Sequence, residues 1–344
     1  MPNDKVTSQD VAKRAGVSQS AVSRVFTKGA SASQKTIDKV KKAADELGYR
    51  PNVLARSLIT GRSRIIGLVV AYLDNYFYPV ALEKLSNALQ DQGYHVMVFM
   101  ASDTTENIER VVDEILDYQV DGIVAASVPL SSDLAGRCRA AGIPLVFFNR
   151  SQDGDNLTSV TADNYAGGRK VAAFLAAHHP DRIGYIAGWE GASTQRDREA
   201  GFRDGLQEAG LEIQSRTVGN FQSDSARAAA LAMFSTPHHP DAVFVANDHM
   251  AFAVMDVLRN ELHLSVPGDV ILVSYDDVPP AAWAAYSLTT VRQPTNQMVA
   301  QTVKVMMEAI GAEGCAPESI KIDGPLIVRG SAPAPKGWPG HTKP

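Results

Sequence analysis

Four polar residues near the start of the chain have the types and the spacing needed to read the edges of DNA bases. They share one face of a predicted helix and are Gln19, Ser20, Ser23 and Arg24. Glutamine and arginine side chains suit paired hydrogen bonds to adenine and guanine in the major groove. The same face would also suit the solvated side of a small helical bundle, so the spacing alone leaves both interpretations open.

A second group of polar and aromatic residues stands directly after predicted strands. In a parallel α/β sheet, ligands bind outside the carboxyl ends of the strands. Carboxylates, amides and guanidiniums there can fix ring hydroxyls, and an aromatic side chain can stack on a sugar or a base. Any one of them could instead be a loop charge or a helix cap. The residues in these positions are Asp74, Phe77, Tyr78, Asn149, Arg150, Thr194, Arg198, Phe221, Asn247, Asp248, Asp276 and Asp277.

Catalytic and metal-binding patterns have little support in the sequence. The motif His-His-Pro-Asp occurs at 178–181 and at 238–241, but each copy precedes a strand, at the sheet edge opposite the expected ligand site. Adjacent side chains also diverge, so surface turns explain the paired histidines better than a metal site. The glycine pair at 167–168 lacks the spacing of a dinucleotide-binding or phosphate-binding loop. We therefore expect no enzyme activity, no metal and no cofactor.

Three short helices are expected to position the first group of residues. Thr7 is a predicted N-cap, with Asp10 three residues later as in a capping box. Gly16 can take the positive φ that the following turn requires. Ser18 caps a second helix up to Phe26, and a third helix is predicted from 33 to 48. Two short helices joined by a glycine turn form a helix-turn-helix unit.

The charge distribution supports DNA binding by this end of the chain. Residues 1–64 hold 13 Lys or Arg and 5 Asp or Glu, a net charge of +8. The whole chain has 33 basic and 38 acidic residues, a net charge of −5, so residues 65–344 carry −13. A basic N-terminal region followed by an acidic remainder is expected when only the N-terminal region contacts the phosphate backbone of DNA.

Length and composition limit the other classes of protein. A chain of 344 residues with 45% apolar and 21% charged residues is typical of a globular protein with more than one domain. No apolar run approaches the roughly 20 residues of a membrane span, and the polar N-terminus lacks the core of a signal peptide. The two cysteines, Cys138 and Cys315, lie far apart in sequence, so we expect a cytoplasmic protein without disulfides.

Beyond 64 the sequence alternates strand-like and helical segments. Alternation of this kind predicts parallel sheets built from βαβ units. Eight strands in two similar groups favour two α/β subdomains, while a single continuous sheet would be unusually wide. The predicted strands are 65–71, 95–100, 122–127 and 144–149 in the first group, and 182–188, 212–220, 242–247 and 270–275 in the second.

Two blocks near the start, VAKRAGVSQSAVSRVF and LGYRPNVLARSL, resemble the lac repressor/gal repressor family of bacterial transcription factors. The resemblance implies a recognition helix from Ser18 to Phe26 and a hinge helix after Pro51 that forms when two subunits meet on an operator. In the family a leucine of this hinge wedges into the minor groove, and here it would be Leu58. The plain alternative is an interdomain linker. The DNA-contacting residues implied are Thr7, Ser18, Gln19, Ser20, Ser23, Arg24, Asn52, Ala55 and Leu58.

The resemblance continues through the rest of the chain, in DNYFYP, FFNR, VTADNYAGGR, SYDD and LTTVRQP. It implies an effector-binding core of the periplasmic-binding-protein type. Position by position, Arg198 and Asp276 match effector-contacting residues, and Phe221 matches a stacking aromatic. Phe77 and Tyr78 match aromatics of the opposite subdomain. The expected effector site is Phe77, Tyr78, Arg150, Asp163, Thr194, Arg198, Phe221, Asn247 and Asp276.

The expected domain organisation follows from these matches. A helix-turn-helix domain occupies 1–50, and the hinge helix and linker occupy 51–64. The core occupies 65–330, with one subdomain at about 65–162 and 292–324 and the other at about 163–291 and 326–330. The Pro- and Gly-rich segment 331–344 is expected to be a disordered tail.

One departure from the family pattern is Thr27, which stands just after the recognition helix where the family often has asparagine and which has a shorter reach toward the DNA. Gln19 and Ser20 stand at variable specificity positions, so the resemblance does not give the operator sequence. The sequence thus predicts a homodimeric transcriptional repressor that binds a pseudo-palindromic operator in double-stranded DNA. A small-molecule effector, most simply a sugar or sugar derivative, would control it. The alternatives are a purine-responsive regulator of the same fold and a sugar-binding protein of a transport system.

Overall fold

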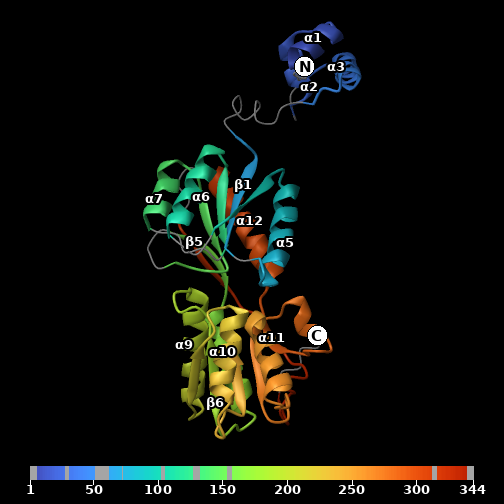
Figure 1. Ribbon diagram of the computed structural model, residues 1–344. Helices are drawn as coiled ribbons and strands as arrows, with labels where there is room; N and C mark the ends of the chain where they lie inside the picture. Colours follow the sequence, from blue (N-terminus) through green and yellow to red (C-terminus); the bar gives the residue numbers. More distant parts are fainter. Residues whose placement is uncertain are drawn as a thin grey trace. The chain divides into compact units, whose positions relative to one another are not determined.

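The computed structural model describes residues 6–27, 31–50, 62–71, 73–101, 105–126, 132–152, 157–311 and 316–338 (Figure 1). The chain forms two compact units, Met1–Ser63 and Arg64–Pro344. In the described part of the chain, no helix combines the length and the apolar character needed to cross a membrane.

The first unit is a bundle of three helices, α1 (Ser8–Ala15), α2 (Gln19–Val25) and α3 (Gln34–Leu47). The predicted capping box is present, since Thr7 accepts a hydrogen bond from Asp10 N and the Asp10 carboxylate accepts one from Thr7 N. Gly16 has a φ of 66° and turns the chain between α1 and α2. The helices pack around a small apolar core of Val11, Ala12, Val22, Val40, Ala43 and Ala44.

The second unit contains two six-stranded sheets, which confirms the prediction of two α/β subdomains. The first sheet has the order β11-β5-β4-β3-β1-β2, and its strand pairs are parallel. Its strands are β1 (Ile65–Val70), β2 (His95–Met100), β3 (Gly122–Ala126), β4 (Leu145–Phe148), β5 (Thr158–Ala162) and β11 (Ser319–Ile322). Its helices are α5 (Phe77–Asp91), α6 (Thr105–Asp117), α7 (Ser132–Ala140) and α12 (Thr295–Gly311).

The second sheet has the order β12-β10-β9-β8-β6-β7 and is parallel except for β12. Its strands are β6 (Ile183–Ala187), β7 (Ser215–Val218), β8 (Ala242–Val245), β9 (Ile271–Asp276), β10 (Thr289–Arg292) and β12 (Leu326–Ile327). Its helical segments are α8 (Asn164–Ala176), α9 (Ser193–Glu208), α10 (Ser223–Phe234), α11 (Asp248–Asp256), η1 (Val257–Glu261) and η2 (Pro279–Ala282).

Both faces of the first sheet are covered by helices, as buried parallel strands require (Figure 1). Leu68 and Val70 of β1 face α5 and α12, whereas Val69 faces the core beneath α6 and α7. Cys138 of α7 is buried in that second core, and Cys315 lies outside the described residues. Side chains along β1 therefore alternate between two apolar layers, so the strand reads as a continuous apolar run.

The chain passes between the two sheets three times. It crosses from β5 to α8, from β10 to α12 and from β11 to β12. The crossings place the carboxyl ends of strands from both sheets around a shared space, which is where the ligand site was expected.

The segment 331–338 differs from the expectation of a disordered tail, because it packs on the second sheet. The Ser331 hydroxyl donates a hydrogen bond of 2.7 Å to the carbonyl of Leu272. The Trp338 ring meets the Phe174 ring edge to face, with centroids 5.1 Å apart. Composition was misleading here, since a few apolar and hydroxyl side chains are enough to dock a proline-rich segment on β9 and α8. Residues 339–344 lie outside the described residues.

Candidate effector pocket and DNA-facing helix

Helix α2 presents the polar face predicted for base recognition. Ser18 caps the helix by accepting a hydrogen bond from Ala21 N at 3.2 Å. Val22 is buried in the bundle core, which fixes the opposite side of the helix toward solvent. The predicted DNA-contacting residues of this region are all exposed, and they are Thr7, Ser18, Gln19, Ser20, Ser23 and Arg24.

Hydrogen bonds within the unit set part of this surface. Gln19 Nε2 donates to the hydroxyl of Ser8 at 2.9 Å, so the glutamine is held against α1. The Thr27 hydroxyl donates to the Ser23 carbonyl at 2.8 Å and closes the end of the helix. Three further predicted DNA contacts, Asn52, Ala55 and Leu58, lie outside the described residues and stay predictions.

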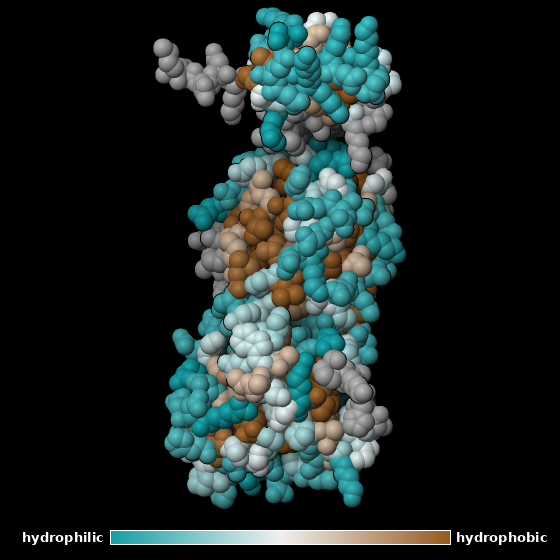
Figure 2. Space-filling model, turned by 90° about the vertical axis from the view of Figure 1, so that its right-hand side faces the viewer, coloured by the Kyte–Doolittle hydropathy of each residue, from teal (hydrophilic) through white to brown (hydrophobic). Residues whose placement is uncertain are grey.

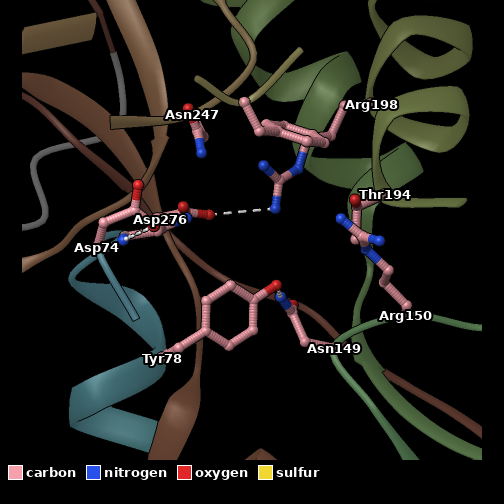
Figure 3. A pocket seen from close by; sticks show the side chains of 10 residues that line it. Asp74, Tyr78, Asn149, Arg150, Thr194, Arg198, Asn247 and Asp276 are labelled. Atoms are coloured by element: carbon pink, nitrogen blue, oxygen red, sulfur yellow. Dashed lines mark hydrogen bonds and ion pairs between the residues drawn. The ribbon is translucent and has the colours of Figure 1, made fainter. Parts of the chain in front are cut away.

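A pocket lies between the carboxyl ends of the two sheets (Figure 3). The space among its lining residues is about 380 Å³, which includes space open to solvent. One wall is formed by residues that follow β1 and β4 and by a residue of α5. The other is formed by residues of α9, by residues that follow β7 and β8, and by the last residue of β9. The lining is Asp74, Asn75, Tyr78, Asn149, Arg150, Thr194, Arg198, Phe221, Asn247 and Asp276.

Arg198 is the most tightly held residue of the pocket. Its Nε donates to Asn164 Oδ1 at 2.9 Å, its Nη1 to the Ala246 carbonyl at 2.6 Å and its Nη2 to Asp276 Oδ1 at 3.2 Å. The guanidinium also lies over the Tyr275 ring, 3.7 Å from the centroid. Since both the guanidinium and its partners are buried, these bonds fix the direction in which the charge faces the pocket.

Asp276 completes a buried ion pair with Arg198 (Figure 3). Its Oδ1 also accepts a hydrogen bond from Gln293 Nε2 at 2.7 Å. Burial raises the pKa of Asp276 above its usual value, while the nearby charge of Arg198 and the hydrogen bond from Gln293 act in the opposite direction. The ion pair and the hydrogen bond from Gln293 together hold the Asp276 side chain in the second wall of the pocket.

A second carboxyl group, that of Asp248, is buried behind this wall. It accepts hydrogen bonds from Thr290 Oγ1 at 2.7 Å and from Val278 N at 3.0 Å. Burial, followed by the negative charge of Asp276, raises the pKa of Asp248 to about 8. The group is thus largely protonated at neutral pH, which leaves Asp276 as the acidic partner of Arg198.

Amide and hydroxyl groups supply further hydrogen-bonding positions. Asn247 caps α11 by accepting a hydrogen bond from Met250 N at 3.0 Å, and its amide nitrogen turns toward the pocket (Figure 3). On the opposite wall, Asn149 Nδ2 donates to the hydroxyl of Tyr78 at 3.2 Å. Thr194, at the start of α9, also lines the pocket. Donors and acceptors therefore face the pocket from both sheets.

Aromatic rings border the polar groups. Phe221 has a φ of 59° and packs so closely on Gly188 that a Cβ there would lie 2.1 Å from the ring. This close approach sets the ring at the edge of the pocket. Arg150 lies over the Trp189 ring, 5.5 Å from the centroid.

Two residues predicted for the effector site do not line the pocket. Phe77 is buried in the core of the first sheet, where its ring stacks on Phe148 at 6.2 Å. Neighbouring residues of a helix point about 100° apart, so only Tyr78 of the two aromatics can face the pocket. The side chain of Asp163 caps α8 by accepting a hydrogen bond from Ala166 N at 2.9 Å. Asp163 is therefore a helix cap, which was the alternative interpretation of such residues.

Three lining residues were not chosen from the sequence. Asp74 and Asn149 were noted after their strands but were not selected, and Asn75 was missed. Asn75 accepts a hydrogen bond from Phe77 N at 3.1 Å, so it orders the start of α5. Their position after β1 and β4 is the signal that could have identified all three. Within the described residues, no group of three or more His, Cys, Asp or Glu side chains is arranged to hold a metal ion.

Two protein families match separate parts of the chain. Residues 7–52 match the family described as bacterial regulatory proteins, lacI family. Residues 66–314 match the periplasmic binding protein domain.

Relatives match almost the whole chain. The HTH-type transcriptional regulator CelR of Thermobifida fusca is 32% identical over 334 residues, which cover 94% of this chain and 98% of CelR. The HTH-type transcriptional repressor PurR of Vibrio vulnificus (strain CMCP6) is 28% identical over 326 residues, which cover 94% and 97%. These relatives are named as regulators of transcription.

Solved structures show the same architecture. A complex of the transcriptional regulator CelR with cellobiose has 30% sequence identity and a TM-score of 0.72, with 95% of this chain and 100% of that chain covered. The lac repressor dimer bound to operator and the anti-inducer ONPF has 26% identity and a TM-score of 0.86, with 96% and 100% covered.

Proposed function

The chain belongs to the lacI family of bacterial regulatory proteins, and we propose that a small molecule bound in its pocket controls the affinity of its helix-turn-helix unit for operator DNA. Family membership makes it a DNA-binding transcriptional regulator and favours this over a transport protein. The observation that carries the proposal is the buried pair of Arg198 and Asp276, which faces a pocket built from both sheets.

The pocket chemistry supports a sugar or a sugar derivative as the effector. Carboxylate, amide, hydroxyl and guanidinium groups alternate around it, and Phe221 offers a ring face at its edge. The hydroxyls of a pyranose can hydrogen-bond to the polar groups, and its apolar face can stack on the Phe221 ring. The solved CelR complex contains cellobiose, which makes a disaccharide the first compound to test. A purine is the second candidate, because a planar base would also stack on Phe221.

An exposed apolar surface supports a homodimer. Figure 2 shows apolar side chains gathered on the half of the second unit that contains the first sheet. β2 is the edge strand of that sheet, and its Val98 and Met100 are 41% and 50% exposed. Exposed apolar edges are places where a second chain can bind. The lac repressor, similar in structure, was solved as a dimer on its operator.

The mechanism we propose is a shift between two arrangements of the sheets. A ligand that contacts both walls favours one arrangement by its difference in affinity for the two. In a dimer, that arrangement would determine how the two hinge segments and helix-turn-helix units meet the operator. The pocket then acts by binding alone, without catalysis, and the protein works in the cytoplasm where its DNA lies.

DNA binding can be tested on a fragment of DNA from upstream of the gene. Binding of the wild type should weaken steeply as salt rises, because basic residues of the first unit displace counterions from the phosphates. Arg24→Ala should lose about 1–3 kcal/mol of specific affinity, the usual value of a good base contact. Gel shifts at several salt concentrations measure both effects, and Lys13→Ala on α1 is a control that should weaken specific and non-specific DNA alike.

Two results in the same gels would contradict the proposed DNA interface. Wild-type binding that does not change between low and high salt would contradict an electrostatic DNA interface. Arg24→Ala with operator affinity within about twofold of the wild type would show that α2 is not the recognition helix.

A further inference from the structure

Two buried amide side chains lie directly behind the Arg198–Asp276 pair, at two of the three places where the chain crosses between the sheets. They are Asn164 and Gln293, each 3% exposed, and neither lines the pocket. Each makes a hydrogen bond to one member of the pair. The ion pair is thus attached to both crossings.

Asn164 belongs to the crossing from β5 to α8. Its Oδ1 accepts the hydrogen bond from Arg198 Nε at 2.9 Å, and its Nδ2 donates to the Ala162 carbonyl at 3.0 Å. One amide therefore joins the last residue of a strand in the first sheet to a pocket residue on α9. A rotation of the first sheet against α9 would strain or break one of these two bonds.

Gln293 belongs to the crossing from β10 to α12. Its Nε2 donates to Asp276 Oδ1 at 2.7 Å, and its backbone N–H donates to the Asp276 carbonyl at 3.1 Å. Its own carbonyl accepts a hydrogen bond from Thr295 N at 2.8 Å, at the start of α12. Gln293 thus connects the pocket carboxylate to the helix that covers the first sheet.

The third crossing is held in a different way. Lys170 of α8 donates to the Gly324 carbonyl at 2.7 Å and pairs with Asp323. These contacts tie the third crossing to the surface of α8. The two amides are therefore distinguished by their direct bonds to the pocket pair.

We propose that Asn164 and Gln293 are positioning residues that couple the state of the Arg198–Asp276 pair to the two crossings. A ligand that changes the hydrogen bonding of the pair would then change the crossings, and through them the angle between the sheets. The inference rests on the proposed function of the pocket as an effector site and assigns its coupling to these two amides. Coupling of this kind needs a physical connection between the pocket and the crossings, and the hydrogen bonds of each amide provide one.

The coupling can be tested without ligand or DNA, so the outcome is separate from that of the proposed function. Asp276→Ala serves as the perturbation of the pair in full-length wild type, in Gln293→Met and in Gln195→Met. The third protein is a matched control, because Gln195 is also a buried glutamine, with hydrogen bonds to Tyr185 and Gly188. Hydrogen exchange of peptides covering 157–166 and 289–296 is measured in all three, with and without Asp276→Ala.

We expect Asp276→Ala to speed exchange at the crossings by about tenfold in the wild type and in Gln195→Met. In Gln293→Met, which should already exchange faster, the further increase should be less than about twofold. The same factor in Gln293→Met as in the wild type would overturn the proposal, because the two substitutions would then act independently.

Asn164 gives a second test that stands if Gln293→Met fails to fold. Asn164→Asp keeps an oxygen facing Arg198 Nε but loses the donor to the Ala162 carbonyl, whereas Asn164→Leu loses both groups at similar size. The proposal expects exchange of 157–166 to be faster than in the wild type in both variants, and faster in Asn164→Leu than in Asn164→Asp. Equal exchange in the two variants would contradict a role for the acceptor oxygen.

Discussion

Arg198 is useful for recognition because its orientation is fixed before a ligand arrives. Three of its N–H groups are already bonded, to an amide oxygen, a main-chain carbonyl and Asp276. Asp276 has a φ of 120°, a conformation that L residues rarely adopt and that its two bonds with Gln293 hold in place. A pair fixed in this way loses little freedom when it binds a ligand.

Removal of either charge should therefore abolish ligand recognition. Arg198→Ala and Asp276→Ala should each cost about 2–5 kcal/mol of effector affinity, since each leaves a buried charged partner without its counterpart. Isothermal titration with cellobiose first, and then with guanine, measures the loss, and ligand-free DNA binding is the control. Near-wild-type affinity in both variants would place the effector site elsewhere.

Asp248 gives a prediction about stability against pH. Its pKa is raised from 3.8 to about 8 in the folded protein, so between these values the folded state holds a proton that the unfolded state has lost. The free energy of unfolding therefore falls as pH rises through this window. Asp248→Asn has no such proton to lose and keeps the size of the side chain.

We therefore expect the free energy of unfolding of Asp248→Asn to rise relative to that of the wild type as pH rises from about 5 to about 8. The increase should be up to about 1 kcal/mol per pH unit. Urea unfolding of both proteins across this range measures the difference, in which the other titrating groups largely cancel. A difference that does not depend on pH would contradict a protonated Asp248.

Sequence reasoning identified Arg198, Asp276 and Asn247 because each follows a strand or starts a helix at the edge where ligands bind. It could not separate Phe77 from Tyr78, since helix register relative to a core depends on tertiary packing. It also could not identify Asn164 and Gln293 as partners of the ion pair. These amides act through contacts between segments 34 and 17 residues apart, which no local pattern reports.

At the scale of elements, the packing of α8 against α9 positions Arg198. Gly168 and Gly201 let the two helices approach until their backbones touch. A Cβ on Gly168 would lie 2.2 Å from the carbonyl oxygen of Arg198, and a Cβ on Gly201 would lie 2.0 Å from that of Tyr165. The short distance between helices is what allows Asn164, at the start of α8, to reach the guanidinium.

Gly168→Ala should consequently push α9 away and disturb the pocket. We expect a loss of about 1–3 kcal/mol of stability, as is typical of overpacking, together with weaker effector binding. Gly136→Ala, on the exposed side of α7 with open space around it, is the matched control and should be neutral or stabilising. Thermal unfolding and ligand titration test both variants, and equal behaviour of the two would refute the close-packing argument.

The apolar strands were predictable, but several strands with polar residues were not. β1 and β3 are continuous apolar runs and β9 begins as one, which is typical of buried parallel strands. β5, β10 and β11 were not predicted, because TSVTA, TTVR and SIKI are short and contain polar residues. Their strand conformation depends on pairing with neighbours already in a sheet, which is a tertiary effect.

At the scale of the whole molecule, DNA attraction and the ligand pocket belong to different units. The first 64 residues carry a charge of +8 and the remainder −13, so attraction to DNA is concentrated in the helix-turn-helix end. The pocket belongs to the acidic second unit. A link between the two is the central claim, because each activity alone would also be found in a simple DNA-binding protein or a simple sugar-binding protein.

Fluorescence anisotropy of labelled upstream DNA, titrated with the protein in the presence and absence of a saturating ligand, tests that link most directly. The ligand is cellobiose, or whichever sugar or purine raises the melting temperature most in a thermal-shift screen. The account predicts that the ligand changes the DNA dissociation constant of the wild type by about 5-fold to 150-fold. Arg198→Ala should keep the ligand-free value and lose the change. A ligand that binds the pocket but leaves the DNA dissociation constant of the wild type within about twofold would contradict the account.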